Sequence, residues 1–94
     1  KVFFVDTDAK TITLPAVAGM HCAVVNAGAD GTVLVTVSPN ANDGIAFVDA
    51  ASTDDKDLLN TKTTARRGDY VVIEYGDATG WQVTRSRGTW AKEA

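Results

Sequence analysis

Short segments rich in apolar and β-branched residues recur about every ten residues along the chain, and turn-forming residues separate them. The clearest is TVLVTVS at residues 32–38, where every second residue from Val33 to Val37 is valine, while threonine, serine and Leu34 face the other side. This spacing is typical of small β-sandwiches and barrels. The segments that carry the pattern are residues 1–5, 11–14, 22–26, 32–38, 45–48, 70–75 and 81–86.

Glycine-containing loops separate several of these segments. Residues 70–86 predict an antiparallel hairpin that turns at residues 76–80. Residues 26–31 contain two glycines, which supply positive φ angles, and predict a second hairpin loop. Residues 49–64 have little pattern and predict a polar loop, with a short strand or a single turn near residues 58–60. In the hairpin of residues 70–86, the side chains expected to face the core are Val71, Ile73, Trp81 and Val83.

The composition favours strands over helices. The chain has 12 valines and 12 threonines against 4 leucines, and 10 aspartates against 2 glutamates. Valine and threonine suit a pleated surface and aspartate suits turns, whereas leucine and glutamate fill most helices. We therefore predict an all-β fold, a small antiparallel β-sandwich or barrel-like domain of about seven to eight short strands. Residues 1–94 form one domain, because two halves would be too small to bury separate cores. The chain begins at Lys1 without a methionine, which is compatible with a short segment before Lys1.

Charge and hydropathy argue against two classes of partner. The net charge is −3, and all four arginines lie in the last third of the chain. Because domains that bind polyanions are usually basic overall, we expect no nucleic-acid partner. Uninterrupted apolar runs are only a few residues long, so we expect no membrane span.

Residues with catalytic or metal-binding chemistry are sparse. The single histidine, His21, precedes the single cysteine, Cys22, and consecutive strand residues point to opposite faces, so the two are not expected to form a nucleophile–base pair. One cysteine and one histidine also make no zinc set. Asp6 with Asp8, and the aspartates within residues 54–57, lack the full ligand spacing of a calcium loop. We therefore expect no enzymatic activity, no metal and no cofactor.

Two segments contain residue types that often anchor protein interfaces. The C-terminal segment RSRGTW places Arg85 and Arg87 on one strand face, with Trp90 just beyond them. In an alternative interpretation, Trp90 closes one end of the core while the arginines are solvated. The N-terminal segment KVFFV holds two phenylalanines among valines, and predicts an edge strand that pairs with another chain or packs in an oligomer interface. The candidate interface residues are Phe3, Phe4, Arg85, Arg87 and Trp90.

A series of short motifs runs along most of the chain. They are Thr-Leu-Pro at residues 13–15, Val-x-Val-x-Pro-Asn at 35–40, Asn-Thr-x-x-Thr-Ala at 60–65, Gly-Asp at 68–69, Trp-x-Val at 81–83 and Gly-Thr-Trp at 88–90. In their order and spacing, these motifs resemble a small β domain that is common among the structural proteins of tailed bacteriophages.

The resemblance implies a structural component of a virion, with no catalytic residues. One role is a capsid decoration, or cement, protein that binds the major capsid protein on the outside of the head, stabilises the head and often forms a homotrimer. The alternative role is a head- or tail-fibre module that contacts host-surface glycans. We expect the decoration role, and therefore a location on the capsid surface of the virion.

A carbohydrate-binding β-sandwich with no virion role is a third interpretation. Sugar sites usually combine exposed aromatic side chains with aspartate, asparagine or arginine. The candidates are Tyr70, Tyr75, Trp81 and Trp90 near Asp77 and Arg85. The chain has seven aromatic residues, and because these must also supply the core, few remain for a sugar-binding platform.

Overall fold

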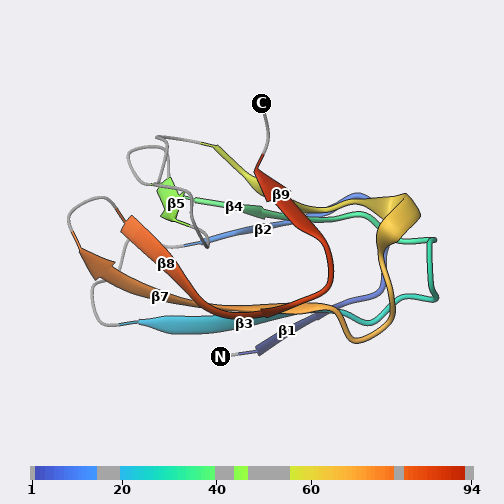
Figure 1. Ribbon diagram of the computed structural model, residues 1–94, viewed down its shortest axis with the longest axis horizontal. Helices are drawn as coiled ribbons and strands as arrows, with labels where there is room; N and C mark the ends of the chain where they lie inside the picture. Colours follow the sequence, from blue (N-terminus) through green and yellow to red (C-terminus); the bar gives the residue numbers. More distant parts are fainter. Residues whose placement is uncertain (1, 15–19, 40–43, 47–55, 78–79, 93–94) are drawn as a thin grey trace.

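The computed structural model is a β-sandwich, as the sequence predicts (Figure 1). The structure describes residues 2–14, 20–39, 44–46, 56–77 and 80–92, and the strands are counted within these ranges. In chain order they are β1 (Val2–Val5), β2 (Lys10–Thr13), β3 (His21–Asn26), β4 (Val35–Ser38), β5 (Gly44–Ala46), β6 (Leu58–Asn60), β7 (Tyr70–Asp77), β8 (Gly80–Arg87) and β9 (Trp90–Lys92). One turn of 3-10 helix, η1 (Lys62–Thr64), follows β6. Parts of the predicted elements lie outside the described residues: Pro15, Asn40, residues 47–48 and residues 49–55.

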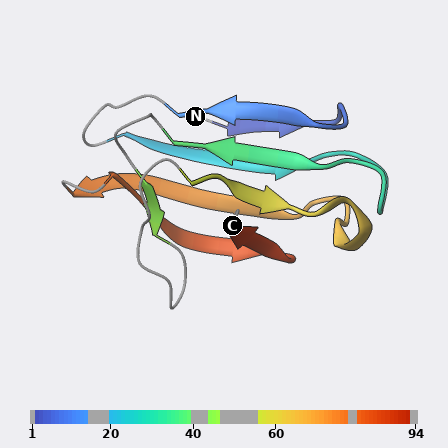
Figure 2. The same cartoon turned by 90° about the horizontal axis from the view of Figure 1, so that it is seen from above.

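The strands form two sheets that pack face to face. The five-stranded sheet has the order β1-β3-β7-β8-β5, and the four-stranded sheet has the order β2-β4-β6-β9. Figure 1 shows the two layers, with β3 and β7 in the lower layer and β2 and β4 in the upper one. Figure 2 shows that β1 and β2 run along the same side of the sandwich. This side is therefore bordered by the edge strands of both sheets.

Both sheets are mixed, whereas the sequence predicted antiparallel pairing. The pairs β1–β3, β2–β4 and β5–β8 are parallel. The first four strands alternate between the two sheets, and each connection reverses the chain, so strands two apart in the sequence become parallel neighbours. The loop at residues 26–31 therefore carries the chain from one sheet to the other, and the prediction that it forms a hairpin is wrong.

Local hydrogen bonds explain this crossing between the sheets. The Asn26 side-chain oxygen accepts a hydrogen bond from the Gly28 N–H at 3.0 Å, and its amide group donates to the Val33 carbonyl at 3.0 Å. A Cβ at Gly28 would collide with the Val33 side chain, so glycine is needed there for space. Of the two glycines in the loop, Gly31 adopts a positive φ, 70°.

The β7–β8 hairpin agrees with the prediction. Its antiparallel register runs from Tyr70 opposite Arg87 to Asp77 opposite Gly80, so the strands extend further into the predicted loop than expected. The residues predicted to face the core are all buried: Val71, Ile73, Trp81 and Val83. In contrast, β9 lies outside every predicted strand. It has only three residues, which is too few to show the alternation of apolar and polar residues that predicts a strand.

A buried polar cluster connects the two sheets at one end of the core. Asn26, Asn60 and Asp69 are each at most 2% exposed. The Asn26 amide donates to the Asn60 side-chain oxygen at 2.7 Å, and the Asn60 amide donates to the Asp69 carboxylate at 3.3 Å and to the Thr89 carbonyl at 3.1 Å. The Arg66 N–H also donates to Asp69, at 2.9 Å. Because an unpaired buried polar group is costly, these bonds fix the position of β3 relative to β6.

Candidate protein-interaction surface

Side chains with catalytic or ligating chemistry are dispersed in the structure. Cys22 is fully buried, whereas His21 is exposed on the opposite face of β3, as the strand alternation predicts. No group of three or more histidine, cysteine or acidic side chains that could hold a metal occurs within the described residues. Asp54 and Asp55 lie outside these residues. Within the same part of the chain, no helix has the length and apolar character needed to span a membrane.

Asp8 has a structural role in the turn between β1 and β2. Its carboxylate accepts a hydrogen bond from the Leu34 N–H at 2.9 Å and forms an ion pair with Lys62. The hydrogen bond from the Lys62 ammonium group, aided by that from Leu34, holds the pKa of Asp8 below its ordinary value. These contacts tie the turn to the segment before β4 and to η1.

The outer face of the five-stranded sheet carries two rows of apolar side chains that end in arginine. Strand register places these residues on the same face, and the face points outward because Val24 and Val71, which lie between the two rows on β3 and β7, are fully buried. The first row consists of Phe4, Val25, Tyr70 and Arg87. The second consists of Val2, Ala23, Val72 and Arg85. We call these eight residues the arginine-bordered face.

The arginine-bordered face is accessible and carries unneutralised positive charge at one side. Phe4 is 73% exposed and Val2 is 53% exposed, and both arginines are exposed. Among the described residues, no carboxylate forms an ion pair with Arg85 or Arg87. Tyrosine and arginine, which lie opposite each other here as Tyr70 and Arg87, are among the residue types most enriched at the energetic centres of protein interfaces. This face therefore has the chemistry of a docking surface.

The outer face of the four-stranded sheet differs in chemistry. Register and burial place Thr11 opposite Thr36 and Thr13 opposite Ser38 there. Leu59 and Ala91 continue the row that starts at Thr11. We call these six residues the hydroxyl face. It carries no charged side chain and exposes mainly small polar groups.

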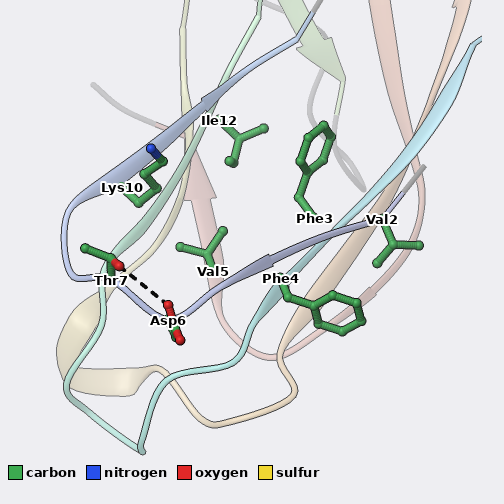
Figure 3. A pocket seen from close by; sticks show the side chains of 8 residues that line it. All are labelled: Val2, Phe3, Phe4, Val5, Asp6, Thr7, Lys10 and Ile12. Carbon is green, nitrogen blue, oxygen red and sulfur yellow. Dashed lines mark hydrogen bonds between the residues drawn. The ribbon is translucent and has the colours of Figure 1, made fainter.

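Beside β1, the open side of the sandwich forms a groove of about 410 Å³. Its lining comprises residues 2–7 together with Lys10 and Ile12. Figure 3 shows Phe3, Val5 and Ile12 between β1 and β2, whereas Val2 and Phe4 lie on the other side of β1. The strand alternation thus directs one set of β1 side chains into the sandwich and the other onto the arginine-bordered face.

The structure brings three of the five candidate interface residues together. Phe4, Arg85 and Arg87 all belong to the arginine-bordered face. Phe3 points inward and packs against the core from the groove. Trp90 is 6% exposed, and its indole N–H donates to the Arg87 carbonyl at 2.9 Å. Trp90 therefore closes one end of the core, in agreement with the alternative interpretation of this residue.

Sequence reasoning missed the centre of the arginine-bordered face. Val25, Tyr70 and Val72 lie there at half-buried positions. The uninterrupted apolar runs CAVV and YVVI could have indicated this apolar outer face. In a strand with one solvated face, apolar and polar residues would alternate. Such runs indicate strands that are apolar on both faces.

The aromatic residues proposed for a sugar site do not form an exposed platform. Trp81 and Trp90 are buried, and Tyr75 packs edge-to-face against Trp81 with ring centroids 5.3 Å apart. Tyr70 is half-buried within the arginine-bordered face. The side chain of Asp77 lies outside the described part of the chain. The described aromatic side chains thus contribute mainly to the core.

Comparison with known proteins adds no assignment: no protein-family model matches the chain, and no curated protein sequence matches it.

Proposed function

We propose that this chain is a non-enzymatic structural protein of a tailed-bacteriophage virion, and that it decorates the outside of the head by docking its arginine-bordered face onto the major capsid protein. The observation that carries the docking proposal is the pair of cross-strand apolar rows that end in Arg85 and Arg87. The virion setting rests on the motif series, from Thr-Leu-Pro at residues 13–15 to Gly-Thr-Trp at 88–90.

The physical chemistry of this face suits a protein partner. Burying Phe4, Val25 and Val72 against another protein would remove apolar surface from water and stabilise the complex. Arg85 and Arg87 would form charge-assisted hydrogen bonds to carboxylates of the partner. The complementary surface of the partner protein is therefore apolar, with acidic groups on the side that contacts β8.

A decoration role suits a small binding surface. One face of a 94-residue chain provides a modest contact area, but an icosahedral shell repeats the same contact at every equivalent position. The summed contacts would then raise the temperature at which the shell dissociates. This role requires no catalytic residue.

The number of chains per virion tests the proposal. Quantitative mass spectrometry of purified particles would measure the chain relative to the major capsid protein. We expect near parity between the two proteins. A few tens of copies or fewer would instead indicate a fibre or collar module and would direct attention to host glycans. Absence of the chain from purified particles would overturn the virion proposal itself.

A further inference from the structure

The backbone of β1 presents hydrogen-bonding groups at the open edge of the five-stranded sheet. The Val5 carbonyl accepts a hydrogen bond from the Ala27 N–H at 2.8 Å, on the side of β3. In a strand, the N–H and C=O of one residue point to the same side, and the side alternates from residue to residue. The backbone groups of Phe3 therefore face β3, and those of Val2 and Phe4 face outward.

The side chains of β1 give no protection to this short edge strand. Natural edges are blunted by charged residues, by proline or by a bulge, whereas Val2–Val5 is wholly apolar and pairs with β3 in an unbroken register. The side chain of Phe4 is 73% exposed beside this edge. These properties indicate a strand whose edge is covered in the assembled protein.

We infer that β1 pairs antiparallel with β1 of a second copy of this chain, with Phe3 opposite Phe3 across a two-fold axis perpendicular to the sheet. In this register, Val2 of each copy lies opposite Phe4 of the other. Both residues direct their N–H and C=O groups outward, so the two pairs exchange four hydrogen bonds. The opposed pairs formed by Val2, Phe3 and Phe4 are all apolar.

The alternative two-fold register, with Phe4 on the axis, is less favourable. It would place Val2 opposite Asp6 of the second copy, beyond the end of β1 at Val5. An aspartate would then lie beside a valine on the joined sheet, without an opposed positive charge. The register with Phe3 on the axis keeps both hydrogen-bonded pairs within Val2–Val5, whereas the register with Phe4 on the axis keeps only the Phe4 pair there.

Pairing through Phe3 also explains the two surfaces beside β1. The two Phe3 side chains would meet at the groove of about 410 Å³ and cover its open side. On the outer face, the row that ends at Val2 would continue into the row that starts at Phe4 of the second copy. The two arginine-bordered faces would become one apolar surface with arginines at both ends. This self-complementarity is the reason to choose a second copy as the occupant of the edge.

The inference does not depend on the proposed role in the virion, because it concerns the isolated chain in solution. It predicts a dimer with twice the 9.9 kDa mass of one chain, formed reversibly with increasing concentration. The homotrimer implied by the motif resemblance would have three times that mass. Sedimentation equilibrium distinguishes these states directly.

Proline substitution tests the edge pairing. Val2→Pro removes an outward N–H that makes no bond to β3, and proline is tolerated at such edge positions. We expect Val2→Pro to weaken dimerisation by about tenfold or more, while the matched Val2→Ala variant still dimerises. Circular dichroism would verify that both variants fold. A wild-type chain that is monomeric or trimeric at every concentration, or a Val2→Pro variant that dimerises like Val2→Ala, would overturn the inference.

Disulfide trapping tests the register. Opposed residues of a non-hydrogen-bonded antiparallel pair have Cα atoms about 4.5 Å apart, within the range for a disulfide. Oxidised glutathione should therefore link Phe3→Cys chains into dimers. In the same register, the two cysteines of Phe4→Cys chains would be more than about 7 Å apart and should not link. The wild-type chain, whose Cys22 is buried, controls for background linkage. Linkage of Phe4→Cys but not Phe3→Cys, or of neither variant, would overturn the proposed register.

Discussion

The two outer faces of the sandwich are built on similar strands but differ in chemistry. The hydroxyl face uses Thr11, Thr36 and Ser38 at its outward positions, whereas the arginine-bordered face uses Val25 and Val72. Valine and threonine have nearly the same shape and both favour strands. The four-stranded sheet therefore forms without apolar residues at these outward positions. It follows that strand formation alone does not require the valines of the arginine-bordered face, which supports a role for them in docking.

Both outer faces depend on the buried polar cluster that connects the two sheets, and removing Asn60 from it should have the largest effect. Asn60→Ala deletes the bonds to Asn26, Asp69 and the Thr89 carbonyl and leaves buried polar groups without partners. We expect the free energy of unfolding to fall by about 2–4 kcal/mol. Urea denaturation would measure the change. Gln82→Ala, at an exposed position of β8, is the control and should change stability by about 0.5 kcal/mol or less. A loss below about 1 kcal/mol for Asn60→Ala would show that the polar cluster does not secure the sheets.

An aspartate placed on each outer face should separate their roles. Val72 and Thr36 are both half-buried at outward positions of central strands, so they form a matched pair. We expect Val72→Asp to weaken binding to particles stripped of this chain by about 30-fold or more, because docking would bury an unpaired charge. Thr36→Asp should bind like the wild type. Rebinding of purified chain, followed by sedimentation of the particles, would measure both affinities. Equal losses for the two folded variants would remove the functional distinction between the faces.

The arginines should give a smaller, salt-dependent contribution to the same binding. Arg87→Gln is expected to weaken particle binding by about tenfold and to reduce its dependence on salt, because a charge-assisted contact to a carboxylate is lost. Arg67→Gln changes an exposed arginine in the turn before β7 that is not part of the arginine-bordered face, and serves as the control. Rebinding assays at low and high salt would measure the difference. If Arg67→Gln had the same effect, the contribution would reflect net charge and not the position of Arg87.

Asp8 should affect stability in acid while leaving both outer faces unchanged. Its pKa is lowered from 3.8 in the folded chain, first by the hydrogen bond from Lys62 and then by that from Leu34. A lowered folded-state pKa stabilises the protein above the unfolded-state value, and the stabilisation is lost as the pH falls through the folded-state value. Asp8→Asn should therefore show a smaller loss of melting temperature than the wild type below about pH 4. Thermal unfolding across the acid range would measure this, and coincident pH profiles would contradict the role of Asp8.

The sequence predicted the strands well where their pattern was periodic. Val33, Val35 and Val37 are all buried as predicted, although β4 begins at Val35 and not at Thr32. The β7–β8 hairpin followed from its flanking apolar segments and central glycines. The sheet crossing at residues 26–31 was not predicted. The Asn26 side chain bonds locally to Gly28 and Val33, but it also bonds to Asn60, which is 34 residues away, and no local sequence pattern reports that contact.

The candidate surface was only partly predictable for a related reason. Alternation placed Arg85 and Arg87 on one face, but it could not place Phe4 on that same face. This placement requires the register of β1 on β3 and of β3 on β7, which depends on sheet order. Alternation separates Phe3 from its neighbour Phe4, but the sheet order decides that Phe3 is the one that points inward. Identifying surface partners from sequence therefore requires the topology as well as the strand boundaries.

Protection of single cysteines on the two faces would test most directly whether the arginine-bordered face is the docking surface. Val72→Cys and Thr36→Cys would be alkylated in the free chain and in purified particles, with the buried Cys22 as an internal unreactive thiol. We predict that assembly slows alkylation of Val72→Cys at least about tenfold and leaves Thr36→Cys at its free rate. Unchanged alkylation of Val72→Cys in the particle, or protection of Thr36→Cys alone, would contradict the account.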